Sequence, residues 1–406
     1  MNNKTNVTKN NKSNKRSASF SLLEVIVIVI MTALVVGVSS SLIVYNNYNK
    51  IKSSYSSDNG EEIDKFIEAY NNILDSYVEK VDDSDLIDEA IKAMYEHLGD
   101  PYTSYLDKTT TDSLEEQLNG EYQGIGVEIS KDYTTGYILV IDVFKNSPAD
   151  EAGLKPGDLI SSVNGESTET KSAEEVSNLI KGSQSENVKI GYIRNEEENM
   201  TTIVVKNVII PSVQSENFDG VGYIYIETFS NTTYSQFKEE LENLENEKIN
   251  SLIIDVRDNT GGYLDAAAKI AELFIEKGKT IYQLEKQGEI YRIHKDETEE
   301  KRNYEVAILI NSNSASASEI LTAALKESYG AKLIGETSFG KGTVQETEKL
   351  DNGEMLKYTT AYWLTPNGTK INNTGLKPDI EVKLEHYETY SYEVDTQLQK
   401  AIQTVK

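Results

Sequence analysis

The chain has 406 residues, of which 38% are hydrophobic, enough for folded cores but too few for a membrane protein with many spans. At about 100–200 residues per domain, this length predicts two to four domains. The 67 acidic residues outnumber 40 lysines and arginines, giving a formal net charge of -27, so we expect no nucleic acid as a partner. With no cysteine, disulfides, thiol nucleophiles and iron–sulfur clusters are excluded. The three histidines match no metal-binding motif, so we expect no metal and no cofactor.

The N-terminus predicts a membrane anchor. Residues 1–19 carry five basic side chains and no acidic one, which indicates a basic cytoplasmic tail. Residues 25–44 contain no charge, and a helix of 20 residues is about 30 Å long, the thickness of the hydrocarbon core of a bilayer. We therefore expect a single transmembrane helix within residues 20–45. Basic residues before it and acidic residues after it predict a cytoplasmic N-terminus and the bulk of the chain outside the cell membrane.

Two alternatives to an uncleaved anchor remain open at this stage. A secretory signal peptide would be cut at small residues, and residues 39–41 are serines. The run Phe20-Ser-Leu-Leu-Glu24 resembles a prepilin processing site, in which Gly or Ala normally precedes the phenylalanine. Ser19 stands at that position here, which favours an anchor with Glu24 at the headgroup boundary.

Residues 46–110 predict a polar stalk and two amphipathic helices. Apolar residues recur at steps of three and four within 63–74 and again within 84–98. Two such helices cannot bury their apolar faces alone, so we expect them to pack on the rest of the chain or on a second copy in a homodimer. The C-terminal extension 386–406 predicts a further helix, at about 394–402, as another candidate for dimer packing.

Residues 111–206 predict a β-rich domain, because short apolar runs alternate with turns that contain glycine. The stretch 147–165 resembles part of a PDZ domain of bacterial proteases. Such domains add the C-terminal strand of a peptide to the edge of their own sheet. The resemblance implies that Gly124, Ile125 and Gly126 form the loop that binds the terminal carboxylate. The alternative is a plain β-turn between strands.

Residues 207–385 alternate strand and helix patterns, which predicts an α/β domain. Strands that are apolar on both faces are expected at 251–255, 306–310 and 331–335, and each leads into an unusual loop rich in glycine or serine. The chemistry of such sheets lies beyond the carboxyl ends of the strands. We therefore expect these three loops to form the active site.

The loop after residue 335 is compatible with two kinds of enzyme, of which the first binds a nucleotide. The run Gly335-Glu-Thr-Ser-Phe-Gly-Lys341 matches seven positions of the phosphate-binding loop, but Gly342 stands where Ser or Thr must ligate magnesium. The residues after Gln345 are polar and acidic rather than helical and apolar. Both features argue against nucleotide binding.

The second kind of enzyme is a serine hydrolase with a lysine base. Ser314, Ser316 and Ser318 lie at a strand-to-helix turn, where backbone amides and the helix dipole favour a developing anion. Two glycines flank Lys341 and leave its amine little room for water. A desolvated lysine has a lowered pKa, so its neutral amine can accept the proton of a serine hydroxyl. The alternative is that the serines only cap and pack the helix.

Several motifs, in a fixed order along the chain, resemble the C-terminal processing peptidase family, also called tail-specific proteases. They are Asp-Val-Arg-Asp-Asn-Thr-Gly-Gly at 255–262, Ser-Ala-Ser-Ala-Ser-Glu at 314–319, and Ile-Gly-Glu-Thr-Ser-Phe-Gly-Lys-Gly-Thr-Val-Gln at 334–345, with matching final strands. The resemblance covers roughly residues 60–385. It implies a crotonase-like α/β catalytic domain (the ClpP/crotonase fold) with an inserted PDZ domain and an N-terminal helical segment.

The family resemblance implies a role for each residue of the site. Ser316 would be the nucleophile, Lys341 the general base, and Gln345 would orient the lysine amine. The amides of Ala317 and of Gly262, or of the glycine before it, would form the oxyanion hole. The expected reaction is cleavage of proteins or peptides that have free C-termini.

A different class of function is a catalytically inactive PDZ scaffold that only binds protein tails. Such a protein would be expected to lose Ser316 or Lys341. Both residues are present together with Gln345, so the sequence favours the enzyme.

Overall fold

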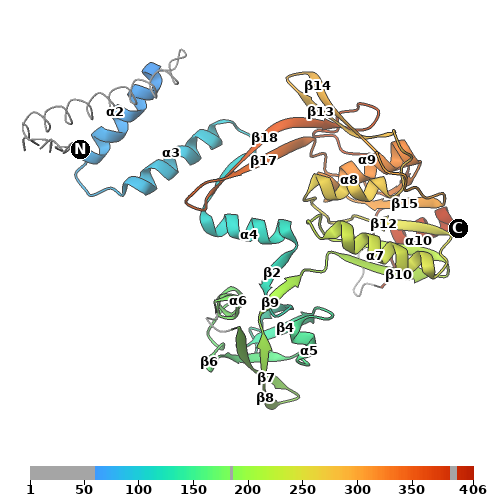
Figure 1. Ribbon diagram of the computed structural model, residues 1–406, viewed down its shortest axis with the longest axis horizontal. Coiled ribbons are helices and arrows are strands. Elements are labelled where there is room, and N and C mark those ends of the chain that lie inside the picture. Colours follow the sequence, from blue (N-terminus) through green and yellow to red (C-terminus); the bar gives the residue numbers. More distant parts are fainter. Residues whose placement is uncertain (1–59, 183–185, 385–390) are drawn as a thin grey trace, which may run out of the picture. The chain divides into compact units, whose positions relative to one another are not determined.

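The computed structural model describes residues 60–182, 186–384 and 391–406 (Figure 1). The predicted cytoplasmic tail and transmembrane helix lie outside these residues. Within the described ranges, no helix combines the length and the apolar character needed to cross a bilayer. The chain divides into two units, with the boundary between Ala90 and Ile91.

The first unit contains the two helices predicted from apolar periodicity. Helix α2 spans Gly60–Ser76, and helix α3 begins in this unit and spans Asp83–His97. Acidic residues occupy the first turn of both helices, where negative charge is favoured by the helix dipole. The prediction of two amphipathic helices is therefore confirmed.

The larger unit is built around a six-stranded sheet in the order β10-β11-β12-β15-β16-β19. All neighbours pair in parallel except β10 and β11, which are antiparallel. The strands are β10 (Val213–Phe218), β11 (Val221–Ile226), β12 (Ser251–Asp255), β15 (Glu305–Ile310), β16 (Lys332–Gly335) and β19 (Ile380–Glu381).

Both faces of this sheet are covered, as the two-sided apolar strands require. Helices α7 (Thr233–Asn246), α8 (Leu264–Glu272) and α9 (Ala317–Ala324) contribute to a core cluster with Ile254 and Ile308 (Figure 1). The alternate residues of the same strands face helix α10 (Thr396–Val405) in a second cluster. The predicted layered α/β architecture is confirmed, and α10 buries its apolar face on its own sheet.

In a second sheet, β1 near the start of this unit pairs with β18 near its end. Its order is β1-β18-β13-β14, with β17 also paired to β18. The strands are β1 (Ser104–Leu106), β13 (Thr280–Lys286), β14 (Glu289–Lys295), β17 (Thr343–Lys349) and β18 (Met355–Leu364). The segment after Lys341 is thus a strand, and it provides no helix of the kind that a phosphate-binding loop requires.

The β-rich domain has a separate core of thirteen buried apolar residues. Helix α4 (Lys108–Asn119) leads into it and contains the predicted start of the domain at residue 111. Strands β2 and β9 pair at its entry and exit, and the main sheet has the order β3-β4-β5-β7-β8, with β6 on β5. The elements are β2 (Glu121–Gly124), β3 (Val127–Lys131), β4 (Ile138–Val143), α5 (Pro148–Glu151), β5 (Leu159–Val163), β6 (Glu166–Ser167), α6 (Ala173–Lys181), β7 (Asn187–Arg194), β8 (Glu197–Val204) and β9 (Lys206–Ile209).

Candidate active site

Three loops that follow neighbouring parallel strands meet at one edge of the six-stranded sheet. Strands β12, β15 and β16 are adjacent, so the loops after their carboxyl ends emerge side by side. A Cβ placed on Gly261, in the first loop, would lie 2.8 Å from the Cβ of Ser316 in the second. The backbone of Gly261 therefore approaches the serine as closely as a residue without a side chain allows.

The serine run divides its hydroxyl groups between packing and the open site. Ser314 donates its hydroxyl to Val256 O at 2.7 Å, and Ser318 donates to Asn259 O at 2.8 Å. Both tie the start of α9 to the loop after β12. The hydroxyl of Ser316 donates no hydrogen bond to any residue that the structure describes. Of the three serines, Ser316 is thus the one whose hydroxyl proton is not donated to a backbone carbonyl among the described residues.

Ser316 also has an unusual backbone conformation, with φ 57° and ψ -115° at the start of α9. Positive φ is disfavoured for residues other than glycine, and such strain persists only where the surroundings hold it. Here the Ser316 N–H donates to Glu319 Oε2 at 2.9 Å, and its carbonyl accepts from Ile320 N at 3.0 Å.

One buried carboxylate joins the serine loop to the lysine loop. Glu319 Oε2 accepts the N–H groups of Ser316 and Lys341, both at 2.9 Å. Its Oε1 accepts Ser338 Oγ at 2.6 Å and Gly340 N at 2.7 Å. Burial raises the pKa of Glu319 above its ordinary value, although these four hydrogen bonds oppose the rise. Sequence analysis missed this residue, although its position three residues after Ser316 is that of a capping-box glutamate.

The Lys341 side chain is largely removed from water. Burial lowers the pKa of Lys341, and the nearby Lys357 lowers it further, whereas Asp100 and Glu319 act in the opposite direction. Its Nζ lies 4.5 Å from the centroid of the Tyr102 ring. The net lowering makes a neutral amine accessible at a lower pH than for an ordinary lysine.

Ser316, Lys341 and Gln345 do not form a hydrogen-bonded chain. Among the described residues, no hydrogen bond joins Ser316 Oγ to Lys341 Nζ, nor Gln345 to Lys341. Gln345 Nε2 instead donates to Thr343 Oγ1 at 3.0 Å and to Thr359 Oγ1 at 3.1 Å. Long or missing hydrogen bonds are common in catalytic sites without substrate.

The two glycines of the first loop differ in the engagement of their backbone amides. The Gly261 N–H already donates to Asn259 Oδ1 at 2.8 Å. The Gly262 N–H donates to no described residue, and a Cβ at Gly262 would lie 2.1 Å from Phe229 O. The Ala317 N–H is in the first turn of α9, where amides have no partner within the helix.

Charged and amide side chains brace the loop that carries these glycines. Arg257 pairs with Asp255 at 2.6 Å and with Asp395 of α10 at 2.8 Å, and all three side chains are buried. The Asn259 Nδ2 donates to Ile226 O at 2.8 Å. Arg257 and Asn259 therefore hold the loop in place through these contacts.

No histidine takes part in this site among the described residues. His97 ends α3, and His294 on β14 stacks on Tyr282 and lies 3.1 Å from Glu272 Oε1. His386 lies outside the described residues.

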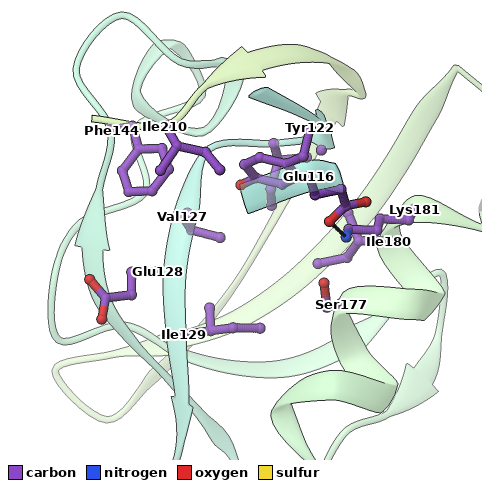
Figure 2. Close-up of a pocket in the computed structure, with 12 residues that line it drawn as sticks. Glu116, Tyr122, Val127, Glu128, Ile129, Phe144, Ser177, Ile180, Lys181 and Ile210 are labelled. Carbon is purple, nitrogen blue, oxygen red and sulfur yellow. Dashed lines mark hydrogen bonds and ion pairs between the residues drawn. The ribbon is translucent and has the colours of Figure 1, made fainter. Parts of the chain in front are cut away.

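The β-rich domain contains a pocket of about 310 Å³ lined mainly by residues of β3 and α6 (Figure 2). Val127 and Ile129 face Ile180 across it, and Lys181 pairs with Glu116 at 2.6 Å. The pocket has an apolar interior with one ion pair beside it, which suits the apolar end of a peptide.

Two of the three residues predicted for the carboxylate loop, Gly124 and Ile125, line this pocket. The third, Gly126, does not; its carbonyl accepts Phe144 N at 3.0 Å. Burial raises the pKa of Tyr122, and the amides of Gly126 and Val127 oppose that rise.

The fold and the two sites together are those of a serine peptidase with a separate peptide-binding domain. Residues 220–382 match the model of peptidase family S41, residues 139–194 match a PDZ domain, and residues 32–110 match the activating protease CtpB N-terminal domain.

Whole-chain comparisons agree with these matches. The carboxy-terminal processing protease CtpA of Bacillus subtilis (strain 168) is 36% identical over 91% of this chain and 79% of its own length. A probable CtpA-like serine protease of Staphylococcus aureus (strain COL) is 35% identical over 89% of this chain and 73% of its own. A solved photosystem II D1 C-terminal processing protease is 25% identical over 78% of this chain and 92% of its own, with a TM-score of 0.46. The chain belongs to the carboxy-terminal processing proteases of peptidase family S41, which are serine proteases, and it carries a PDZ domain.

Proposed function

We propose that this chain is a membrane-anchored serine endopeptidase that binds protein C-terminal tails through its PDZ domain and cleaves them with Ser316 and Lys341. The observation that carries the proposal is the division within the serine run. Ser314 and Ser318 donate their hydroxyls to backbone carbonyls. The Ser316 hydroxyl makes no such donation, and Ser316 lies beside Gly261. The crotonase-like form of the catalytic domain is part of the same proposal.

The chemistry follows from the two loops that Glu319 holds together. The neutral Lys341 amine accepts the proton of Ser316 as Oγ attacks the scissile carbonyl carbon. The protonated amine then gives that proton to the leaving nitrogen of the substrate, and an acyl-serine remains. Water, deprotonated by the same amine, hydrolyses the acyl-serine. Gln345 lies on β17, four residues after Lys341, and would orient the amine when substrate is bound.

The developing oxyanion needs two donors that point at one place. The amides of Ala317 and Gly262 are proposed for this role, because Gly261 N–H is already engaged by Asn259. The Gly261 N–H would have to break its hydrogen bond to Asn259 before it could donate to the oxyanion of the transition state.

Substrate selection is proposed to begin at the PDZ pocket. The loop of Gly124, Ile125 and Gly126 would receive a free terminal carboxylate, and the apolar pocket would receive the last side chain. The anchor, the cytoplasmic N-terminus and the catalytic domain outside the cell membrane rest on the sequence pattern alone. A homodimer remains a prediction as well.

The dyad is tested by labelling with a fluorophosphonate probe and by peptide cleavage. Ser316→Ala is expected to lose both, and Lys341→Ala is expected to lose cleavage with labelling slowed on the order of 100-fold or more. Ser235→Ala and Lys332→Ala, which change exposed residues, serve as matched controls and should behave as wild type. Full cleavage by either dyad variant would refute the proposed mechanism. A wild-type chain that binds tails but is neither labelled nor active would instead be a scaffold.

A further inference from the structure

A short segment between α3 and β1 forms part of the surroundings of the general base. Tyr102 presents its ring to Lys341, with 4.5 Å between Nζ and the ring centroid. Within the described residues, Lys341 Nζ donates no hydrogen bond, so this cation–π contact is its one directed interaction there. Geometry of this kind stabilises an ammonium group and does little for a neutral amine.

The segment is fixed in place by Asp100. Its Oδ1 accepts Tyr102 N at 3.1 Å, and its Oδ2 accepts Thr103 Oγ1 at 2.6 Å together with the hydroxyl of Thr359. Thr103 Oγ1 in turn accepts Thr359 N at 3.1 Å. Thr359 is also the residue to which Gln345 Nε2 donates. The segment before β1 and the predicted orienting residue of the dyad are thus joined through one threonine.

Charged groups face Lys341 from every element around it. Glu319 of α9 and Asp100 of the segment favour the ammonium form, and Lys357 of β18 disfavours it. Burial adds to the effect of Lys357. The Tyr102 ring carries no charge itself, but it attracts the Lys341 amine only when the amine is protonated.

We propose that Tyr102 is a positioning residue for the catalytic base, holding the protonated Lys341 side chain in a resting position and releasing it toward Ser316 once the amine is neutral. This inference rests on the proposed Ser316–Lys341 dyad. It explains why the resting structure shows the amine over a ring and no hydrogen bond between the two dyad residues. It also assigns a function to the segment between α3 and β1.

The inference predicts the direction of a change in pH dependence. A weaker cation–π contact stabilises the ammonium less, so the pKa of Lys341 falls and the acid limb of the activity profile moves to lower pH. For a partly desolvated contact, the expected total shift is about 0.5–1 pH unit. A side chain with a purely structural role would change the rate at all pH values without moving the midpoint.

The test keeps the shape of the ring and changes its electrostatics. Tyr102→Phe and three versions of this variant with one, two or three fluorines on the ring are made in the full-length chain. The rate of Ser316 labelling by a fluorophosphonate probe is measured from about pH 5 to pH 10. Tyr102→Phe should keep the wild-type midpoint, and each added fluorine should move it further toward acid. Equal midpoints across the fluorinated series, or a shift toward alkali, would overturn the inference.

Two further measurements separate this inference from the dyad itself. If Lys341→Ala retains the wild-type labelling rate and pH profile, the dyad is wrong, whatever the fluorinated series shows. If Lys341→Ala is inactive and the fluorinated series is flat, the dyad stands and the role of Tyr102 falls. Thermal unfolding of each variant shows whether it is folded, and Tyr291→Phe, an exposed tyrosine on β14, controls for loss of a phenol hydroxyl.

Discussion

Glu319 shows how one side chain can hold together the two loops of the proposed catalytic pair. Its two oxygens accept four donors, which come from the serine loop, the lysine loop and Ser338. All four partners are donors, so a carboxylate, which has only acceptor oxygens, satisfies them. An amide, which also carries N–H donors, does not. The separation of Ser316 and Lys341 therefore depends on a carboxylate that takes no part in the bond changes.

Glu319→Gln should lower both the activity and the stability of the protein. The glutamine NH₂ would face backbone N–H or hydroxyl donors, and leaving buried donors unsatisfied costs about 1–3 kcal/mol. We expect kcat/KM to fall on the order of 10–100-fold and the melting temperature to fall as well. Peptide cleavage and thermal unfolding measure both, with the exposed Glu289→Gln as control. Wild-type kcat/KM in the Glu319 variant would show that the carboxylate is dispensable.

Lys341→Arg should be as inactive as Lys341→Ala, because a guanidinium stays protonated and cannot act as a base.

In the wild type, kcat/KM should rise with pH as the lowered pKa of Lys341 is passed and the neutral amine becomes populated. Peptide cleavage across the pH range provides the measurement. A profile that is flat from about pH 5 to pH 10 would argue against a lysine base.

At the scale of elements, helix α10 is connected to the active-site loop through charge. Arg257 lies directly before the residues that lead to Gly262, and it pairs with Asp395 at the start of α10. Asp395 also caps that helix by accepting Leu398 N at 2.9 Å, and Gln397 accepts from Arg257 at 2.9 Å. The C-terminal helix and the proposed oxyanion loop are therefore one hydrogen-bonded structure.

Asp395→Ala should destabilise the protein and disturb catalysis together. It removes a cap and leaves Arg257 with fewer partners, and removal of one partner of a buried ion pair costs about 3–5 kcal/mol. We expect a lower free energy of unfolding, faster proteolysis of the C-terminal helix and a reduced kcat. Denaturant unfolding and cleavage assays on Asp395→Ala and on the exposed control Asp351→Ala measure these effects. Equal unfolding free energies in the two variants would contradict the role of the clamp.

At the scale of the whole molecule, the PDZ domain is an insertion whose two connections run side by side. Strands β2 and β9 pair, and Ile210 N donates to Gly120 O at 2.9 Å. A Cβ at Gly120 would lie 2.2 Å from Ser230 Oγ, so this connection touches the catalytic domain closely.

Tail recognition is tested by two peptides that differ only at the terminal group. The acid should be cleaved with a higher kcat/KM than the amide, because only the carboxylate can form charge-assisted hydrogen bonds with the amides of the proposed loop. We expect a difference on the order of 10-fold or more. A peptide with an apolar last residue is the appropriate substrate, given the apolar pocket. Equal kcat/KM for acid and amide would leave a serine–lysine peptidase without tail recognition.

The sequence by itself determined the features that depend on residue type and local spacing. Apolar periodicity identified the helices and the buried strands, since those patterns repeat every few residues. The serine run and the glycine-flanked lysine indicated the chemistry, because a nucleophile and a desolvated base need those residue types. The choice of Ser316 among three serines came from the family resemblance, and its available hydroxyl agrees with that choice.

The tertiary structure decided the features that join distant parts of the chain. Tyr102 meets Lys341 only because β1 pairs with β18, and Arg257 meets Asp395 across 138 residues because α10 covers the sheet. Glu319 accepts the Lys341 N–H across 22 residues because the loops after β15 and β16 emerge side by side. Each of these contacts is selected by packing between elements, and no local pattern in the sequence encodes which distant elements will meet.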